Sequence, residues 1–125
     1  MKAWFWAALA LLVCGCAKVP PTLAGGKPVR HWVEALHGPD AKARRKAAAK
    51  LGNVGGADPV VLPALTAALR DGDAGVRREA ILALLKCGPG AREAAGPLAE
   101  LRRRDRDPQV RACAAKALAR MQAAE

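Results

Sequence analysis

The sequence lacks the residue patterns that mark the common catalytic, metal and cofactor sites. It contains no Gly-x-Ser-x-Gly segment, no phosphate-cradling glycine loop, no His-Glu-x-x-His and no Cys-x-x-Cys-His. Its two histidines, His31 and His37, are six residues apart, which is a poor helical spacing for a shared metal, and only Glu34 is a nearby carboxylate. We therefore expect no enzyme activity, no metal, no cofactor and no small-molecule substrate.

A long hydrophobic run is also missing. The longest apolar stretch, Ala3 to Val13, has eleven residues, whereas a membrane-spanning helix needs about 20. It follows Met1-Lys2, has the length of a secretory hydrophobic region, and ends in Val13-Cys14-Gly15-Cys16. This ending resembles the lipobox of bacterial lipoproteins, which implies cleavage after Gly15 and lipidation of Cys16.

The lipobox resemblance divides the start of the chain into two parts. Residues 1–15 are predicted to be a signal peptide. Residues 16–27 are predicted to be the lipidated cysteine and a flexible tether, which contains Pro20-Pro21 and Gly25-Gly26. The protein would then be lipid-anchored in the cell envelope, and Ala17 after the cysteine favours the outer membrane. Two alternatives stay open: a conventional secretory peptide cleaved nearby, or an uncleaved anchor.

Acidic residues are scarce, with 11 Asp and Glu against 21 Lys and Arg, and the formal net charge is +10. Removal of the signal peptide would take away one positive charge, Lys2, and leave +9. A basic chain raises the question of nucleic acid, but an exported lipoprotein rarely meets it, so we expect no nucleic-acid partner. Acidic protein surfaces or anionic head groups and polymers are the expected counterparts, unless the charge only solvates the helices.

A short motif recurs through the rest of the chain. Its copies are Ala43-Arg44-Arg45, Val76-Arg77-Arg78 and Val110-Arg111-Ala112, spaced by 33 and then 34 residues. Each copy begins three residues after an aspartate, namely Asp40, Asp73 and Asp107. Self-similarity at this period is typical of stacked helix pairs, and aspartates in this position are typical helix N-caps. The sequence therefore predicts six helices in three antiparallel pairs.

The repeat resembles the HEAT family, especially its bacterial variant with aspartate-rich turns. The residues that carry the resemblance are Pro63 and Pro97, Asp71 and Asp105, Val76 and Val110, and Arg77 and Arg111. It implies an all-α fold: a short right-handed α-solenoid of the ARM-type superhelix. The expected domain covers residues 28–121, with repeats at about 28–56, 57–89 and 90–121 and a tail at 122–125.

Two repeats depart from the family pattern. In the first, Gly38 replaces the turn aspartate and Arg30 replaces the proline, so we expect an N-terminal cap with Trp32 as its plug. In the third, Arg102 and Arg103 occupy slots that hold Ala68 and Leu69 in the second repeat. Its first helix is expected to rotate and to bury Leu98 and Leu101 instead.

The family resemblance also implies a ladder of ion pairs and hydrogen bonds between repeats. Arg44, Arg77 and Arg111 match its arginines, and Asp71 and Asp105 match its aspartates. An arginine can satisfy a carboxylate and a backbone carbonyl together. We interpret these five residues as structural.

The residues that face away from the apolar side of the second helices are the candidates for recognition. They are predominantly basic, and the predicted binding residues among them are Arg45, Lys46, Lys50, Arg78, Lys86, Lys116 and Arg120. The other candidates are Asn53, Glu79, Leu82, Ala112 and Cys113. The leading hypothesis is a non-enzymatic, membrane-tethered adaptor that binds an acidic protein through the predicted binding residues. The alternatives are a solvated helix surface, and a basic envelope protein that binds anionic polymer or lipid head groups through charge alone.

The two cysteines inside the repeats are not expected to form a disulfide. In the repeat register Cys87 aligns with Met121, eight positions beyond Cys113, which corresponds to an axial offset of about 12 Å. The Cα atoms of a disulfide lie within about 7 Å of each other. The sequence predicts two free thiols.

Overall fold

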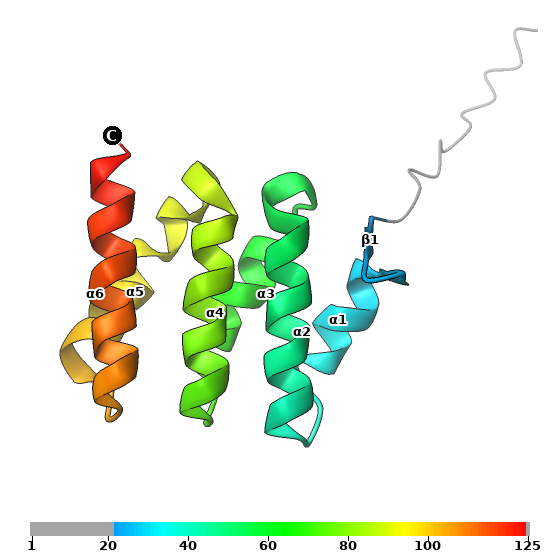
Figure 1. The fold of residues 1–125 in the computed structure, drawn as a ribbon, viewed down its shortest axis with the longest axis horizontal. Helices are drawn as coiled ribbons and strands as arrows, with labels where there is room; N and C mark the ends of the chain where they lie inside the picture. The colour runs from blue at the N-terminus through cyan, green and yellow to red at the C-terminus, as the bar shows by residue number, and fades with distance from the viewer. Residues whose placement is uncertain (1–21, 125) are drawn as a thin grey trace, which may run out of the picture.

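The structure is a computed structural model that describes residues 22–124 (Figure 1). The predictions on residues 1–21, including the signal peptide and Cys16, lie outside the described residues. The elements in chain order are β1 (Leu23–Ala24), β2 (Lys27–Pro28), α1 (Val29–Ala35), α2 (Ala41–Val54), the 3-10 helix η1 (Gly55–Ala57), α3 (Val61–Ala68), α4 (Ala74–Lys86), the 3-10 helix η2 (Gly88–Ala94), α5 (Ala95–Arg104) and α6 (Pro108–Ala123).

The six α-helices of the described chain form two layers. Figure 1 shows α2, α4 and α6 side by side in one layer, with α1, α3 and α5 behind them. Each second helix packs on the first helix of its own repeat and on the second helix of the next. The all-α solenoid predicted from the repeat is confirmed.

The second helices begin where the repeated aspartates predict. Asp40 accepts hydrogen bonds from the N–H groups of Lys42 and Ala43, Asp73 from Val76, and Asp107 from Gln109 and Val110. These carboxylates satisfy amide groups that the first helical turn leaves without partners. The three caps therefore start the second helices at equivalent positions of the three repeats.

The core is built from small residues and a few leucines. Ala47, Ala80 and Ala114 occupy one register and are completely buried, which lets the helices approach closely. Larger buried side chains fill the space between the layers; they are Leu51, Leu65, Leu69, Ile81, Leu84 and Leu98. Within residues 22–124 no polar or charged residue is fully buried.

The third repeat rotates its first helix as predicted. Leu98 of α5 is fully buried and Leu101 is half-buried, while Arg102 and Arg103 are exposed. The 3-10 helix η2 leads into α5 and places Ala91 and Ala94 in the core. Helix α6 continues to Ala123, two residues beyond the predicted end of the domain.

The described part of the predicted tether is not a free linker, which corrects the expectation for residues 16–27. Strands β1 and β2 pair antiparallel, with Leu23 opposite Pro28 and Ala24 opposite Lys27. The turn between them uses positive φ angles at Gly25 (56°) and Gly26 (76°), which glycine adopts without strain. Trp32 Nε1 donates a 2.7 Å hydrogen bond to the buried Ala24 carbonyl. Trp32 and the hairpin therefore close the N-terminal end of the stack together.

Candidate functional site

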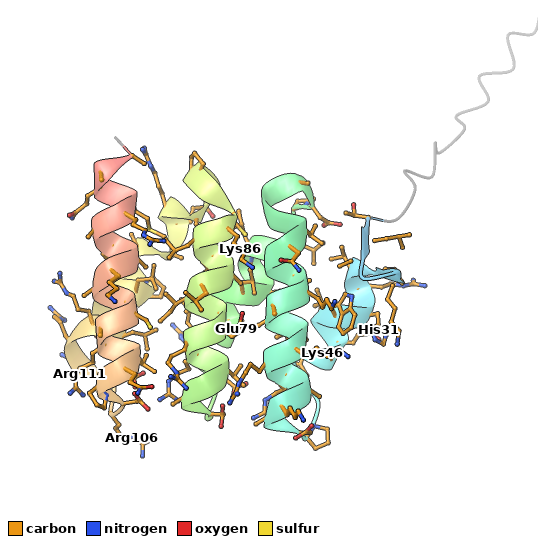
Figure 2. All side chains as sticks on the ribbon, in the orientation of Figure 1. His31, Lys46, Glu79, Lys86, Arg106 and Arg111 are labelled. Atoms are coloured by element: carbon orange, nitrogen blue, oxygen red, sulfur yellow. The ribbon has the colours of Figure 1, made fainter. Side chains whose placement is uncertain are left out.

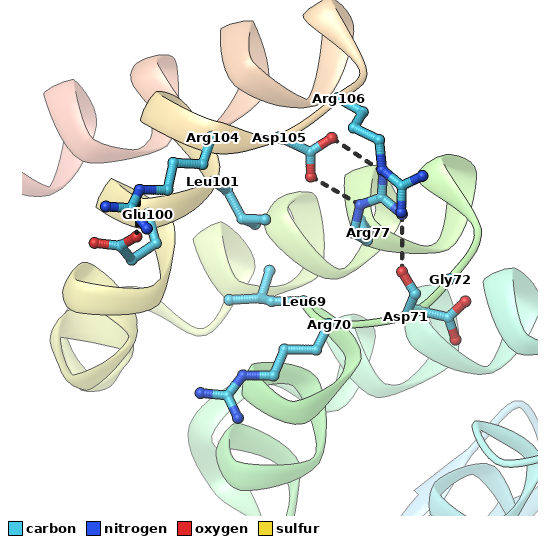
Figure 3. Close-up of a pocket in the computed structure, with 10 residues that line it drawn as sticks. All are labelled: Leu69, Arg70, Asp71, Gly72, Arg77, Glu100, Leu101, Arg104, Asp105 and Arg106. Atoms are coloured by element: carbon cyan, nitrogen blue, oxygen red, sulfur yellow. Dashed lines mark hydrogen bonds and ion pairs between the residues drawn. The ribbon is translucent and has the colours of Figure 1, made fainter.

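The loops between paired helices contain two interlocked arginine–aspartate junctions. Arg44 Nε and Nη2 donate to Asp71 at 2.9 and 3.2 Å, and Arg44 Nη1 donates to the Gly38 carbonyl at 2.9 Å. Arg77 repeats the pattern one step along, with bonds of 2.9 and 3.0 Å to Asp105 and of 2.8 Å to the Asp71 carbonyl (Figure 3). Each arginine therefore ties the loop of its own repeat to the loop of the next.

The two ladder aspartates are kept ionised by their surroundings. Partial burial alone would raise the pKa of Asp71, but hydrogen bonds from Arg44 and the Asp73 N–H, with the charges of Arg44 and Arg77, outweigh it and lower that pKa. The same balance lowers the pKa of Asp105, through Arg77 and the Asp107 N–H. The hydrogen bond to Asp71 in turn raises the pKa of Arg44. These pairs are structural braces between repeats.

Arg111 is the third arginine of the series and has a different set of partners. Its Nη1 donates to the Asp105 carbonyl at 2.6 Å, as Arg77 does to Asp71. Its other close contact is the Arg106 carbonyl at 3.4 Å. No carboxylate of residues 22–124 accepts a hydrogen bond from it.

Three of the seven predicted binding residues bridge neighbouring second helices. Arg45 Nη2 lies 3.8 Å from the Asp73 carboxylate, and Arg78 donates to the Gln109 side-chain oxygen. Lys86 Nζ donates to Asn53 Oδ1 at 3.2 Å. Arg45 crosses directly over Gly75, where a Cβ atom would lie 2.1 Å from Nη2. These three cations therefore link neighbouring second helices; only Arg45 has a carboxylate as its partner, whereas Arg78 and Lys86 contact neutral side chains.

The other four predicted binding residues differ in whether they contact another part of the chain. Lys50 lies against the N-terminal hairpin, with Nζ 3.1 Å from the position of a Cβ on Gly25. Lys46, Lys116 and Arg120 are exposed and have no hydrogen-bond or ion-pair partner within the described chain. Figure 2 shows Lys46 on the same side of the stack as Glu79 and Lys86 of α4. We call the exposed surface formed by Lys46, Glu79, Leu82, Lys86, Lys116 and Arg120 the second-helix face.

Leu82 is the apolar member of this surface, and the sequence pattern had placed it among the candidates for recognition. It is 46% exposed, one of three large exposed hydrophobic residues in the described chain, and it belongs to the middle helix, α4. In the repeat register it aligns with Ala49 and Lys116, so an apolar residue stands where the other repeats have a small and a charged one.

The histidines, cysteines and acidic side chains of the described chain form no metal-binding cluster. No group of three or more His, Cys, Asp or Glu side chains within residues 22–124 could hold a metal ion. His31 packs edge-on against Trp32, with ring centroids 4.9 Å apart. A depression of about 340 Å³ beside the ladder is lined by Leu69, Leu101 and charged residues, without histidine, cysteine or hydroxyl (Figure 3). Cys87 and Cys113 are free thiols.

None of the described helices is both long and apolar enough to cross a bilayer.

The two layers of paired helices, their common register and the ladder between their loops define an α-solenoid of short helical repeats. Residues 29–119 match the family model of HEAT repeats, so the chain belongs to the HEAT-repeat family. HEAT repeats in general serve as scaffolds for protein–protein interaction. No curated protein matches the chain in sequence.

The chain is also similar in structure to an engineered protein whose crystal structure was determined by a structural genomics consortium. The TM-score is 0.61 at 23% sequence identity, and the match covers 77% of this chain. It covers 46% of the engineered chain, so the present chain spans less than half of that protein's length. At this identity the likeness shows the fold alone.

Proposed function

We propose that this HEAT-repeat chain is a non-enzymatic adaptor of the cell envelope, held at the membrane through lipidated Cys16, and that it binds an acidic protein through the second-helix face. The observation that carries the proposal is the exposed Leu82 on α4 with the unpaired cations Lys46, Lys116 and Arg120 on the two flanking helices, α2 and α6. Protein interfaces commonly have an apolar core surrounded by a polar rim. The surrounding cations would speed encounter with an acidic surface and select against basic ones.

The bridges across the second helices determine which residues a test should change. Arg45, Arg78 and Lys86 hold neighbouring helices together, so their reversal would mix a folding defect with a binding defect. Lys46, Lys116 and Arg120 have no such contacts, and their replacement should leave the fold intact. A matched control reverses three exposed arginines of the other layer, Arg30, Arg70 and Arg102, with the same change in net charge.

The experiment is an affinity pull-down from envelope membranes with the intact, membrane-anchored protein, quantified by mass spectrometry. The triple change Lys46→Glu, Lys116→Glu, Arg120→Glu should abolish recovery of a specific acidic partner, and the control triple change should preserve it. Leu82→Ala should weaken recovery about tenfold, because burial of a leucine side chain contributes about 1.5–3 kcal/mol. Undiminished recovery by the second-helix triple variant would refute the proposal.

The rival function is binding of anionic polymer or lipid head groups by charge alone. It is favoured by the exposed arginines of the other layer, Arg102, Arg103 and Arg106, which give that side a positive charge as well. Such binding should fall steeply with rising salt and should weaken equally in both triple variants. A shape-dependent protein interface should depend on salt much less and should distinguish the two variants.

The membrane anchor has its own test, since Cys16 lies outside the described residues. Metabolic labelling with a radioactive fatty acid should mark the wild-type protein, and Cys16→Ser should lose the label. Retention of lipid on this variant would refute lipidation at Cys16 without affecting the second-helix face.

A further inference from the structure

The depression beside the ladder has an apolar floor. It lies between the second and third repeats, has a volume of about 340 Å³, and both of its sides are formed by described residues. Figure 3 shows Leu69, at the end of α3, and Leu101 of α5 next to each other in it. Leu69 is almost completely buried and Leu101 is half-buried. This depression, which we call the ladder hollow, has room for an apolar side chain of another molecule.

The acidic residues that line the ladder hollow already have cationic partners. Asp71 and Asp105 are held by the ladder arginines, with an Nε–oxygen distance of 2.9 Å in each pair. Glu100 lies 2.8 Å from Arg103 and 3.6 Å from Arg104. The three carboxylates therefore leave little uncompensated negative charge in the hollow.

Two arginines that line the hollow have no such partner. The side chains of Arg70 and Arg106 are exposed, and no hydrogen bond or ion pair joins either of them to another residue of the described chain. In Figure 3 the two leucines lie between Arg70 and Arg106. The rim of the hollow therefore carries an excess of positive charge on both sides of its apolar floor.

Arg106 also connects the hollow with a second depression. This second depression has a volume of about 400 Å³ and shares Gly72, Arg77 and Arg106 with the ladder hollow. It continues along the start of the next helix to Asp107 and Pro108. A ligand that occupies both depressions has to be elongated, and an extended peptide segment has that shape.

The ladder itself does not require the residues that distinguish this hollow. The first junction, between Arg44 and Asp71, forms with other side chains at the equivalent positions. One repeat earlier, the positions of Arg70, Leu101 and Arg106 are occupied by His37, Ala67 and Gly72. The dipole of α5 favours cations in its last turn, but Arg106 lies beyond that helix. The two arginines and the leucine are therefore specific to the second junction.

We propose that the ladder hollow binds an extended acidic segment of another protein. An apolar side chain of the segment packs on Leu69 and Leu101, and carboxylates on either side of it pair with Arg70 and Arg106. An arginine can hold a carboxylate through two parallel N–H bonds, which fixes the position of the segment. None of these four residues belongs to the second-helix face, so this site and the proposed adaptor site can fail independently.

Selection of short peptides on the full-length protein in detergent tests this site. Binders from a random display library are sorted with two variants: Arg70→Glu with Arg106→Glu, and the triple reversal of Lys46, Lys116 and Arg120. Peptides that bind the ladder hollow should be lost with the first variant and retained with the second. Their consensus should be one large apolar residue flanked by acidic residues.

Fluorescence anisotropy of the consensus peptide then measures the role of charge. Its affinity should fall about tenfold or more in the variant with Arg70→Glu and Arg106→Glu. The matched control is Arg30→Glu with Arg102→Glu, which changes the net charge equally at exposed positions outside the hollow and should leave the affinity unchanged. A peptide with lysine in place of the acidic residues should prefer the reversed variant to the wild type.

Leu101→Ala tests the apolar floor. Alanine is the residue of the second repeat at this position, Ala67, so α5 should still form. The affinity for the consensus peptide should fall about tenfold. Poly-glutamate and phosphatidylglycerol vesicles, which offer negative charge without an exposed apolar side chain, should compete only weakly. Circular dichroism must show each variant folded; if the double glutamate variant is not, Arg70→Gln with Arg106→Gln takes its place.

Three results would overturn the proposal. The first is a selection that yields no peptide whose binding depends on Arg70 and Arg106. The second is an unchanged affinity in the folded Leu101→Ala variant. The third is competition by poly-glutamate or the vesicles as strong as that of the consensus peptide, which would assign these arginines to binding by charge alone.

Discussion

Gly52 marks the closest approach between α2 and α4, and its replacement by alanine should have an effect opposite to that expected from helix propensity. Glycine inside a helix is less favourable than alanine by about 1 kcal/mol, so Gly→Ala usually stabilises. At Gly52 a Cβ would lie 2.8 Å from both Cα and Cβ of Ala83 on the neighbouring helix. Real Cβ atoms do not approach a backbone carbon this closely, so α2 and α4 must separate.

The size of the effect follows from the two opposing contributions. Overpacking of a close contact costs roughly 1–3 kcal/mol, against a gain of up to about 1 kcal/mol from helix propensity. Gly52→Ala should therefore lower the free energy of unfolding by about 1–2 kcal/mol. For a domain of about 100 residues each kcal/mol corresponds to about 4–8 °C in the melting temperature.

Ala112 provides the matched control. It is an exposed residue in the interior of α6. Ala112→Gly measures helix propensity without a packing change and should lower the free energy of unfolding by about 1 kcal/mol. If propensity alone decided the outcome, Gly52→Ala would raise stability by a similar amount, so a loss of stability at Gly52 isolates the packing contribution.

Urea unfolding followed by far-UV circular dichroism measures both variants. The midpoint should fall both for Gly52→Ala and for Ala112→Gly, with similar slopes. Ala83→Gly in the Gly52→Ala background should recover part of the loss, with a coupling energy of at least about 0.5 kcal/mol. A Gly52→Ala protein as stable as the wild type would refute the reasoning.

Three further predictions concern the ladder, the N-terminal cap and one thiol. The pKa values of Asp71 and Asp105 are lowered in the folded state. Their contribution to stability is therefore complete above about pH 4 and is lost as the pH falls through the pKa values of the folded state. Asp105→Asn should lower the free energy of unfolding by about 2–3 kcal/mol and should weaken this dependence on pH in urea titrations. Trp32→Phe removes the donor to the Ala24 carbonyl and should speed amide exchange in β1–β2 while leaving α6 unchanged. Burial raises the pKa of the Cys87 thiol. Iodoacetamide should therefore modify this thiol slowly near neutral pH in the folded protein, and faster once urea has unfolded it. Rapid modification of Cys87 in the folded protein would contradict its burial.

The parts of the fold that repeat were accessible from the sequence, because each is present in several copies. The aspartate caps, the helix pairing and the burial of Leu98 in place of Arg102 all follow from aligning one repeat with another. The N-terminal hairpin has no copy and only two residues in each strand. Its sequence, with two adjacent glycines, is equally compatible with a flexible linker. The hairpin is distinguished from a linker by contacts with distant residues, such as the indole bond from Trp32 to the buried Ala24.

The binding residues were harder to assign for a different reason. The positions of Arg45 and Arg78 in the repeat predict exposed side chains without a partner. In the structure, however, both side chains contact a residue of the next repeat. Whether they do so depends on the residue that faces them, Gly75 for Arg45 and Gln109 for Arg78. These contacts join residues about one repeat apart in the sequence. They cannot be predicted from the spacing of residues along a single helix.

The registers that vary between repeats have a consequence for how a partner must bind. A core register can hold the same residue in every copy, as the one with Leu51, Leu84 and Leu118 does. The exposed registers of the second-helix face do not: one of them holds Ala49, Leu82 and Lys116 in turn. The apolar anchor is therefore on α4, while the free cations are on α2 and α6.

A partner that uses both the anchor and the cations has to span all three second helices, so its affinity should depend on the relative placement of the repeats. The ladder and the bridges from Arg45 and Arg78 determine that placement. Weakening a junction far from the contact surface, as Asp105→Asn does, should then reduce partner binding even while the protein remains folded. Binding that depends only on local charge should not be affected by Asp105→Asn. This variant therefore also distinguishes binding of an acidic protein from binding of an anionic polymer or lipid.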